Sequence, residues 1–253
     1  MTRPNPNSQP IHGNYHGYYS KRPLSEDARL ELVPPALFKG ARVLDIGCNE
    51  GWITCQIAQL KGSRKVIGVD IDDTLIRAAW KRRRTVWSMQ GQTEPLEDEY
   101  FPSSCEHMYG PLPIPSQGMD AAYPHNVVFF CADWVNTEII EDNEGYDVVI
   151  AFSVSKWIHL NGGDDGLMQF FRRVHSVLKP GGTFVFEPQE WDGYAKARRM
   201  DPKLKDNGRK LQIRPEQFEE LLMQVGFSSP EHLGRPGEGG FRRPIDLYHR
   251  EAI

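Results

Sequence analysis

Residues 43–51 read Val-Leu-Asp-Ile-Gly-Cys-Asn-Glu-Gly, and this stretch decides the fold class. The apolar run Val43–Ile46 has the length and composition of a buried parallel strand. Two glycines follow, which let the backbone approach a ligand closely, and then a helical pattern begins. A strand, a glycine turn and a helix in this order are typical of a nucleotide-binding α/β sheet.

A second acidic residue, Asp70, ends the next apolar run, Lys65–Asp70. Because neighbouring parallel strands end at the same edge of a sheet, Asp70 is expected beside the glycine turn, where its carboxylate can accept both hydroxyls of a ribose. The NAD fingerprint needs three glycines around a pyrophosphate, whereas Gly47 and Gly51 are spaced G-x-x-x-G. The pattern therefore favours S-adenosylmethionine, which has an adenosine and no pyrophosphate. The alternative is an ordinary strand, turn and helix with a capping acid.

Strand and helix patterns alternate along the rest of the chain. Strands are expected at Asn126–Cys131, Tyr146–Phe152, Thr183–Glu187, near Phe227–Leu233 and at Ile245–His249, and helices at Ile71–Trp87, Leu167–Leu178 and Pro215–Val225. This order predicts an α/β fold, the Rossmann-like, seven-stranded and mostly parallel sheet of a class I S-adenosylmethionine-dependent methyltransferase, with an antiparallel strand near the C-terminus. The carboxyl ends of its strands would gather Gly47, Asp70, Cys131–Trp134 and Phe152–Lys156 around one crevice.

Composition limits the class of protein. The chain has 253 residues, of which 39% are hydrophobic, enough for a single methyltransferase domain over residues 1–253. No apolar run is long enough to span a membrane, and the scattered cysteines and histidines argue against disulfides and a metal site. Residues 1–13 are expected to be a disordered tail, and the proline-rich residues 88–125 a mobile insertion. Reduced thiols predict a nuclear or cytoplasmic protein.

Two further segments carry residues suited to chemistry. Asn14–Tyr19 holds three tyrosines in a stretch without core periodicity, and we expect it to fold over the crevice. The alternative is a tail with no role. Ser153–Asn161 follows the fourth strand, where Lys156, Trp157 and His159 offer a cation, a stacking plane and a second donor. Its alternative is a helix cap beside a core tryptophan.

Several motifs together resemble the methylphosphate capping enzyme family, the bicoid-interacting group of RNA 5′-phosphate methyltransferases. The most specific are Asn14–Tyr19 and Lys156-Trp157-x-His159-Leu160-Asn161, and the others include Val43–Asn49, Val69–Asp72, Leu178–Gly182, Glu187–Gln189, Pro215–Phe218, Val225–Ser229 and Gly240–Pro244. The resemblance covers residues 14–250 apart from the insertion. It implies methyl transfer from S-adenosylmethionine to a 5′-terminal phosphate of a small non-coding RNA. The γ-phosphate is the expected acceptor, although one branch of the family acts on a 5′-monophosphate.

The resemblance also implies roles for individual residues. The cofactor would be lined by Tyr19, Arg29, Gly47, Cys48, Asn49, Asp70, Ile71, Asp133, Trp134 and Phe152. Asp70 would take the ribose, Asp133 the adenine amine and Arg29 the methionine carboxylate. The catalytic residues would be Lys156 and Tyr18, and the RNA contacts would come from Trp157, His159, Arg198 and Arg199.

Methylation of a phosphate suits this set of residues. A phosphate oxygen is already anionic near neutral pH, so transfer needs alignment and charge stabilisation rather than a general base. Residues 196–214 hold eight basic side chains against two acidic ones, and together with Lys81–Arg84 and Arg242-Arg243 they would track RNA phosphates. A solvated loop or helix face is the alternative for each basic cluster.

The family resemblance further implies a monomeric enzyme that works beside a La-related protein in a ribonucleoprotein, with no membrane partner. Two other functions stay open. One is an RNA-binding subunit with a methyltransferase-like fold, in which catalysis is secondary or absent. The other is a small-molecule methyltransferase, which would leave the basic residues 196–214 without a purpose.

Overall fold

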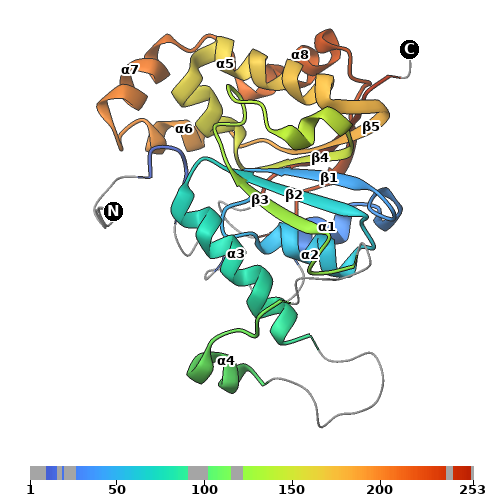
Figure 1. The fold of residues 1–253 in the computed structure, drawn as a ribbon. Coiled ribbons are helices and arrows are strands. Elements are labelled where there is room, and N and C mark those ends of the chain that lie inside the picture. The colour runs from blue at the N-terminus through green and yellow to red at the C-terminus, as the bar shows by residue number, and fades with distance from the viewer. Residues whose placement is uncertain are drawn as a thin grey trace.

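The computed structural model describes residues 10–15, 19, 27–90, 102–114, 122–237 and 242–251. These residues form a seven-stranded sheet in the order β3-β2-β1-β4-β5-β7-β6 (Figure 1). Its strands are β1 (Arg42–Ile46), β2 (Lys65–Asp70), β3 (Val127–Cys131), β4 (Tyr146–Phe152), β5 (Leu178–Glu187), β6 (Glu231–Gly234) and β7 (Ile245–His249). β7 runs antiparallel to both of its neighbours, and the remaining pairs are parallel. The predicted class I methyltransferase fold is confirmed.

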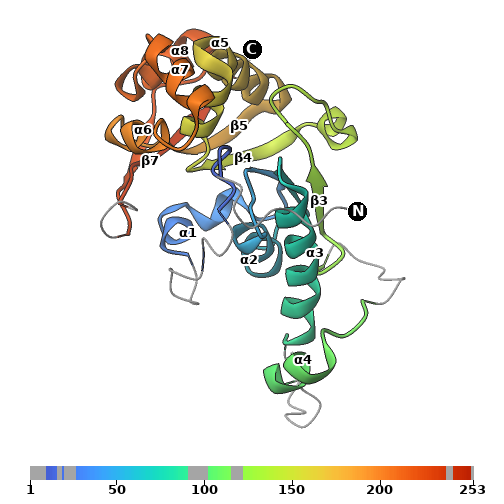
Figure 2. The ribbon, with the colours of Figure 1, turned by 90° about the vertical axis from the view of Figure 1, so that its left-hand side faces the viewer.

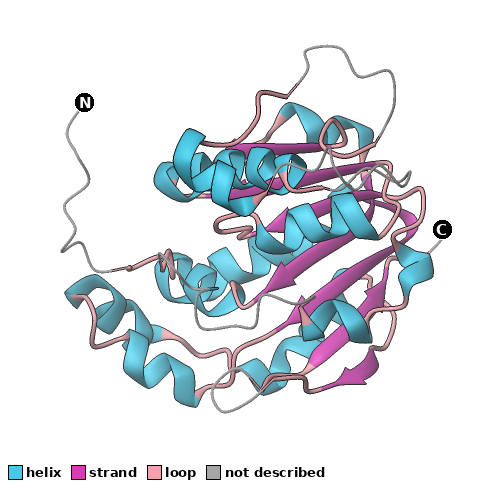
Figure 3. Ribbon diagram, turned by 90° about the horizontal axis from the view of Figure 1, so that it is seen from below, coloured by secondary structure: helices cyan, strands magenta, loops and turns pink. Residues whose placement is uncertain are grey.

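Helices cover both faces of the sheet, whose strands lie side by side in Figure 3. One face carries α1 (Ala28–Leu32), α2 (Trp52–Leu60) and α3 (Asp73–Ser88), and the other carries α5 (Ser155–Val177) and α8 (Phe218–Val225). Two further helices, α6 (Asp192–Ala197) and α7 (Pro202–Lys210), lie against α5. The chain also forms short 3₁₀ helices: η2 (Pro35–Leu37), η4 (Ile140–Glu144) and η5 (Pro215–Gln217). Beyond the end of α3, α4 (Ser103–Tyr109) projects away from the body of the molecule (Figure 2).

Alternating side chains along the strands supply two cores. In β1, Val43 packs with Ile57 of α2, whereas Leu44 packs with Phe170 of α5 on the opposite face. Every residue of β1 is buried, as expected for a central parallel strand. Since helices seal both faces, the carboxyl edge of the sheet is where a ligand can reach the backbone.

Helix boundaries differ from the expectation in three places. α5 begins at Ser155 and not near Leu167, because two helical pieces join across Gly163, whose φ of 70° marks a kink. The expected insertion contains α4, which its irregular composition did not indicate. The basic segment 196–214 contains the whole of α7, and the missed signal was Asp201, whose side chain caps the helix ahead of Pro202.

The N-terminal segment also differs from the expectation. Residues 1–9 lie outside the described part of the chain, but residues 10–13 of the expected tail pack against α5, where Asn161 donates from Nδ2 to the Ile11 carbonyl at 2.9 Å. Among the described residues, all four cysteines are free, and no group of His, Cys, Asp and Glu could hold a metal ion. None of the described helices is long and apolar enough to cross a membrane.

Candidate active site

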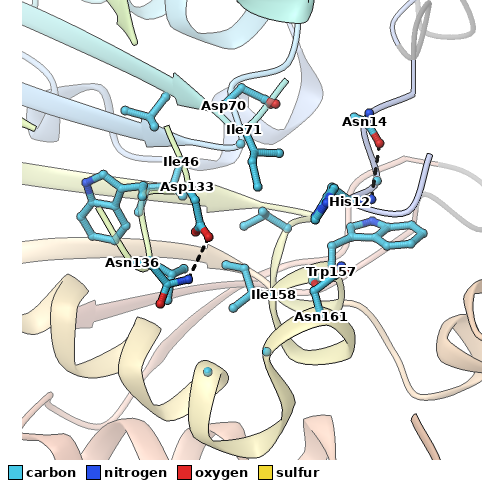
Figure 4. Close-up of a pocket in the computed structure, with 18 of the residues that line it drawn as sticks. His12, Asn14, Ile46, Asp70, Ile71, Asp133, Asn136, Trp157, Ile158 and Asn161 are labelled. Carbon is cyan, nitrogen blue, oxygen red and sulfur yellow. Dashed lines mark hydrogen bonds between the residues drawn. The ribbon is translucent and has the colours of Figure 1, made fainter. Parts of the chain in front are cut away.

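A cavity of about 490 Å³ opens at the carboxyl ends of β1, β2 and β4. Figure 4 shows Asp70 and Ile71 on one side of it and Ile158 and Asn161 of α5 on the other. Asp133 and Asn136 stand at one end, and the N-terminal residues His12 and Asn14 stand at the other. The predicted crevice therefore exists, and Gly47, Asn49, Asp70, Ile71, Asp133, Trp134 and Phe152 all line it.

The glycine turn is built for close approach. Gly47 has φ of 75°, and a Cβ at this position would lie 3.0 Å from Val154 Cγ2. The N–H groups of Gly47 and Cys48 donate to the Val69 carbonyl at 2.8 and 3.0 Å, which fixes the turn against β2. The Cys48 thiol is buried beneath the turn and lines neither this cavity nor the smaller one beside it, so this residue can serve a ligand there through its backbone alone.

Asp70 keeps acceptor capacity facing the cavity. Its Oδ2 accepts from the Asn49 N–H at 2.9 Å, and its Oδ1 accepts from the Asp72 N–H at 3.0 Å. Burial raises the pKa of this carboxyl, and the backbone N–H groups of Asp72, Asn49 and Ile71 oppose that shift. Each carboxylate oxygen has two acceptor sites, so each can still accept one ribose hydroxyl.

The far end of the cavity holds a fixed carboxylate and an apolar platform. Asp133 Oδ2 accepts from Asn136 Nδ2 at 2.8 Å, which orients the carboxylate, and Ile71 is 39% exposed beside it. Trp134 contributes little surface, because it is 2% exposed, donates from Nε1 to Asp142 and packs under the Arg173 guanidinium. Asp133 and Ile71 therefore both have exposed surface that could contact a planar base.

A smaller cavity of about 90 Å³ adjoins the first. The two share walls at Gly13, Gly47, Asn49, Phe152, Ser153 and Trp157. Three cationic side chains, Arg29, Lys156 and Arg243, line the smaller cavity together with Tyr15, Tyr19 and Gln189. A cationic pocket directly beside the glycine turn is suited to an anionic group.

Arg29 and Lys156 differ in how they are held there. Arg29 is 2% exposed, bonds the carboxylates of Asp27 and Glu187, and lies over the Phe152 ring at 4.7 Å. Lys156 Nζ has one long bond, at 3.4 Å to the Gly193 carbonyl, and stands 4.7 Å from the centre of the Trp157 ring. Burial, with Arg243 and Lys196 nearby, lowers the pKa of Lys156 to about 8, so it is still mostly protonated at neutral pH.

Of the residues expected to bind RNA, Trp157 and Arg199 are accessible, whereas His159 is buried. Trp157 lines both cavities, and Arg199 is exposed on the surface beyond α6. His159 lines neither cavity, because it is fully buried between Tyr194 and Asp164, with ring nitrogens 3.2 and 2.7 Å from their oxygens. The structure thus leaves His159 no open face for a direct RNA contact.

Three more residues of the expected site are Arg198, Tyr18 and Tyr19. Arg198 stacks on Trp191 and donates to the Gly208 carbonyl at 3.2 Å, which joins α6 to α7. Tyr18, one of the two expected catalytic residues, lies outside the described residues. Tyr19 is described, and its hydroxyl accepts from Arg29 at 3.3 Å.

Asn14–Tyr19 was expected to cover the crevice, but the sequence did not reveal that residues 10–13 join Asn14 and Tyr15 in an N-terminal strap, Pro10–Tyr15, that walls the larger cavity. Asn14 Nδ2 donates to Asp72 at 2.6 Å, and Asn49 Nδ2 donates to the Tyr15 carbonyl at 3.3 Å. Gly13 lies flat against Trp157, where a Cβ would come within 2.2 Å of the indole Nε1. In the sequence, Gly13 itself was the signal for this close contact. No local pattern links it to Trp157, however, because Trp157 lies far along the chain.

Solved structures with this arrangement define the class of protein. The magnesium protoporphyrin IX methyltransferase of Synechocystis superposes with a TM-score of 0.53 at 16% identity, over 88% of this chain and 76% of that one. The N-methyltransferase NodS of Bradyrhizobium japonicum gives 0.53 at 13% identity, over 89% and 86%. A methyltransferase domain model matches residues 37–86. The chain has the fold of the S-adenosylmethionine-dependent methyltransferases.

Sequence comparison narrows this class to a family. The Bicoid-interacting protein 3 model matches residues 146–250. A probable RNA methyltransferase of Arabidopsis thaliana is 38% identical over 94% of this chain and 79% of its own length, and the U6 snRNA methylphosphate capping enzyme Amus of Drosophila melanogaster is 35% identical over 94% and 74%. The chain belongs to the Bicoid-interacting protein 3 family of methylphosphate capping enzymes, as the sequence motifs predicted.

Two of the relatives are much longer than this chain. The 7SK snRNA methylphosphate capping enzyme of Mus musculus is 38% identical over 94% of this chain. The chain spans 40% of the mouse protein and 39% of the human one.

Proposed function

We propose that this protein is an RNA methyltransferase that transfers a methyl group from S-adenosylmethionine to a 5′-terminal phosphate of a small non-coding RNA. The expected acceptor is the γ-phosphate of a 5′-triphosphate. The observation that carries this proposal is the smaller cavity, where Arg29, Lys156 and Arg243 line a space that adjoins the glycine turn. Membership of the capping enzyme family supports the same assignment.

The larger cavity fits S-adenosylmethionine. A side chain on Gly47 would fill the space beside Val154, so the turn provides a cradle that only glycine leaves open. Asp70 would accept from the ribose hydroxyls, Asp133 would accept from the adenine amine, and Ile71 would pack on the base. Arg29 would approach the methionine carboxylate from the smaller cavity, and Tyr19 would support it through their shared hydrogen bond.

Transfer by this site would depend on position and charge. The sulfonium supplies an electrophilic methyl group, and a phosphate oxygen is already ionised, so the protein needs no base to create the nucleophile. Lys156 would hold the terminal phosphate as a compact cation at the junction of the two cavities. Trp157, beneath the Lys156 ammonium, would shield this contact from water and so strengthen it.

A basic surface on α6 and α7 meets the larger cavity at Lys203, which lines it, and would bind the RNA chain. Its members are exposed on α6, on α7 and between them: Lys196, Arg199, Lys203, Lys205 and Lys210. Such side chains bind phosphates without reading sequence, so they support RNA binding and do not select one RNA. The curated relatives are named for 7SK and U6 small nuclear RNAs, and we extend to this chain a small nuclear RNA substrate and a nuclear location. A La-related partner and a monomeric enzyme belong to the same proposal.

The second candidate function is RNA retention within a ribonucleoprotein, with catalysis secondary or absent. The observation in its favour is that most of the basic surface, all but Lys203, lines neither cavity and would hold RNA whether or not a methyl group is transferred.

One assay separates these functions. The protein is incubated with methyl-labelled S-adenosylmethionine and RNA carrying a 5′-triphosphate, a 5′-monophosphate or a 5′-hydroxyl, and RNA binding is measured in parallel. The proposed activity predicts label on the triphosphate RNA that alkaline phosphatase does not release, because the methylated terminal phosphate is no longer a free monoester. Phosphatase treatment of the RNA before the reaction should abolish labelling, and the hydroxyl RNA should take up no label. Tight binding of all three RNAs without any label would favour retention instead.

A further inference from the structure

A third cavity, of about 610 Å³, lies where β6 and β7 meet α6, η5 and α8. Its lining shares one residue, Gln189, with the smaller cavity and none with the larger. The proposed methyl transfer therefore gives this cavity no role, although its volume is in the range that holds a ligand larger than one side chain.

Aromatic rings form the inner wall of the third cavity. Phe186, Phe218 and Tyr248 line it, and all three are buried members of one of the two cores of the sheet. Trp191 is half-buried and adds a fourth ring to the lining. Because the core fixes three of these rings, the cavity presents an apolar surface that a ligand does not have to order.

The charged side chains of the lining are mostly acidic. Five carboxylates line the cavity, against one arginine and one histidine. Glu190 pairs with Arg235 at 2.6 Å. The other exposed carboxylates, Asp192, Glu216 and Glu219, form no ion pair within the described part of the chain. Negative charge in this cavity is therefore only partly neutralised by the protein itself.

Two buried polar groups also line this cavity. Asp246 is 7% exposed, and its Oδ1 lies 2.7 Å from His232 Nδ1, whereas its Oδ2 has no hydrogen bond to a described residue. Tyr248 is 2% exposed, and its hydroxyl likewise has no hydrogen bond to the residues that the structure describes. Burial raises the pKa of Tyr248, and the carboxylates of Asp246 and Glu219 add to that shift, so the hydroxyl stays protonated. Since buried polar groups are normally hydrogen-bonded, these two indicate a ligand with polar atoms of its own.

An organic cation would satisfy both the carboxylates and the aromatic wall. A guanidinium can donate to two carboxylates at once and can stack on an aromatic ring, which an ammonium cannot do in the same geometry. The protein shows this chemistry beside the cavity, where Arg214 lies 4.0 Å over the Trp191 ring. RNA is disfavoured as the ligand, because its phosphates would meet carboxylates.

We propose that the third cavity docks a basic segment of a protein partner, whose arginine side chain is directed at Asp246 and Tyr248 and is paired by Glu216 and Glu219. Flanking residues of the segment would lie on the aromatic wall. A partner bound in this way would leave the cofactor cavity and the smaller cavity open.

Fluorescence anisotropy tests the proposal with a labelled peptide, Gly-Ser-Arg-Leu-Arg-Ser-Gly, and its lysine counterpart, Gly-Ser-Lys-Leu-Lys-Ser-Gly. The full chain should bind the arginine peptide several-fold more tightly at about 150 mM salt, where weak surface attraction is screened. The double variant Glu216→Gln/Glu219→Gln should weaken this binding about tenfold, because it removes two charge-assisted bonds. The control is Glu138→Gln/Glu220→Gln, which removes the same charge from exposed residues that do not line the cavity.

Tyr248→Phe distinguishes insertion into the cavity from attraction to its surface. The variant keeps the packed ring and the net charge and removes only the hydroxyl, so the arginine peptide should bind about fivefold more weakly, the effect of one hydrogen bond. Unchanged affinity in the folded variant would indicate surface attraction alone and contradict the proposal. Melting curves establish folding, and the glutamine variants keep the test valid if Tyr248→Phe does not fold.

Four further results would overturn this inference. They are no binding of the arginine peptide to wild type, equal binding of the two peptides, equal losses in the double variant and its control, and displacement of the peptide by an equal concentration of spermidine, which would indicate a site for a free polyamine. The assay contains neither RNA nor S-adenosylmethionine, so its result is independent of the proposed methyl transfer.

Discussion

The backbone N–H of Asn49 donates to Oδ2 of Asp70 at 2.9 Å, and this bond joins the glycine turn after β1 to the end of β2. Asn49 has φ of 51°, so the bond also holds the turn in a left-handed conformation. The same carboxylate accepts from Asp72, which caps α3. One side chain thus arranges the loops on both sides of the cavity while keeping acceptor sites for a ligand.

Replacing Asp70 with alanine should weaken cofactor binding strongly. Loss of charge-assisted bonds to two ribose hydroxyls is expected to cost about 1.5–3 kcal/mol, or roughly 10- to 100-fold in Kd. Calorimetry with S-adenosylhomocysteine measures this. The matched control is Asp73→Ala, because Asp73 is exposed and forms an ion pair with Arg77 on the same helix. Equal affinity of folded Asp70→Ala and wild type would remove the ribose assignment.

Replacing Lys156 with alanine should reduce turnover and not cofactor affinity. The ammonium faces the smaller cavity, and removing one electrostatic stabiliser is expected to lower the rate on the order of 10²-fold. Because the pKa of Lys156 is lowered to about 8, the wild-type rate should fall as pH rises through that value and the ammonium loses its proton. A role in helix capping alone predicts a small stability loss of about 1 kcal/mol and a normal rate. Single-turnover rates and melting curves decide between the two.

The N-terminal strap offers a test through Gly13. Gly13→Ala would bring a Cβ within 2.2 Å of Trp157, so the strap should leave the cavity and S-adenosylhomocysteine should dissociate faster. Gly62→Ala is the control, since Gly62 shares a positive φ, 69° against 75°, but has open space around it. Both variants carry backbone strain of roughly 1–2 kcal/mol, so only the effect on dissociation distinguishes them. Identical dissociation rates in the two variants would show that the strap does not retain the ligand.

His159 should act on stability and not on RNA. Burial lowers its pKa below the ordinary value of 6.5, so the neutral ring stabilises the fold above pH 6.5, and this contribution is lost as pH falls through the folded-state pKa. His159→Phe should lower the free energy of unfolding by about 1–3 kcal/mol through the lost bonds to Tyr194 and Asp164, and should flatten the dependence of Tm on acidic pH. RNA affinity measured at pH 7.5 should be unchanged. A tenfold loss of RNA binding in the folded variant would restore the expected RNA contact.

Local patterns predicted the sheet because its central strands are continuous apolar runs. Tyr146–Phe152 was located to the residue, and Asp70 was correctly expected at the end of its strand. Of the ten residues that the family resemblance assigned to the cofactor, seven line the larger cavity. A local sequence pattern can predict a site residue where the same short segment forms the strand or turn and also contacts the ligand.

The parts that could not be predicted depend on distant partners. His159 stands in the most specific motif, yet tertiary packing against Tyr194 buries it. Arg243 was assigned only to a general basic surface, because nothing in its own segment indicates the bond to Ser153. Gly13 was placed in a tail for the same reason. α7 was missed because its amphipathic pattern is short and interrupted by charges.

The most direct test of the central claim is mass spectrometry of the RNA 5′ end after incubation with S-adenosylmethionine and a 5′-triphosphate transcript. The account predicts one added methyl group, located on the terminal phosphate, and no product from the same transcript with a 5′-hydroxyl. A methyl group on a base or ribose, or an unmodified 5′ end in protein that binds both cofactor and RNA, would contradict it.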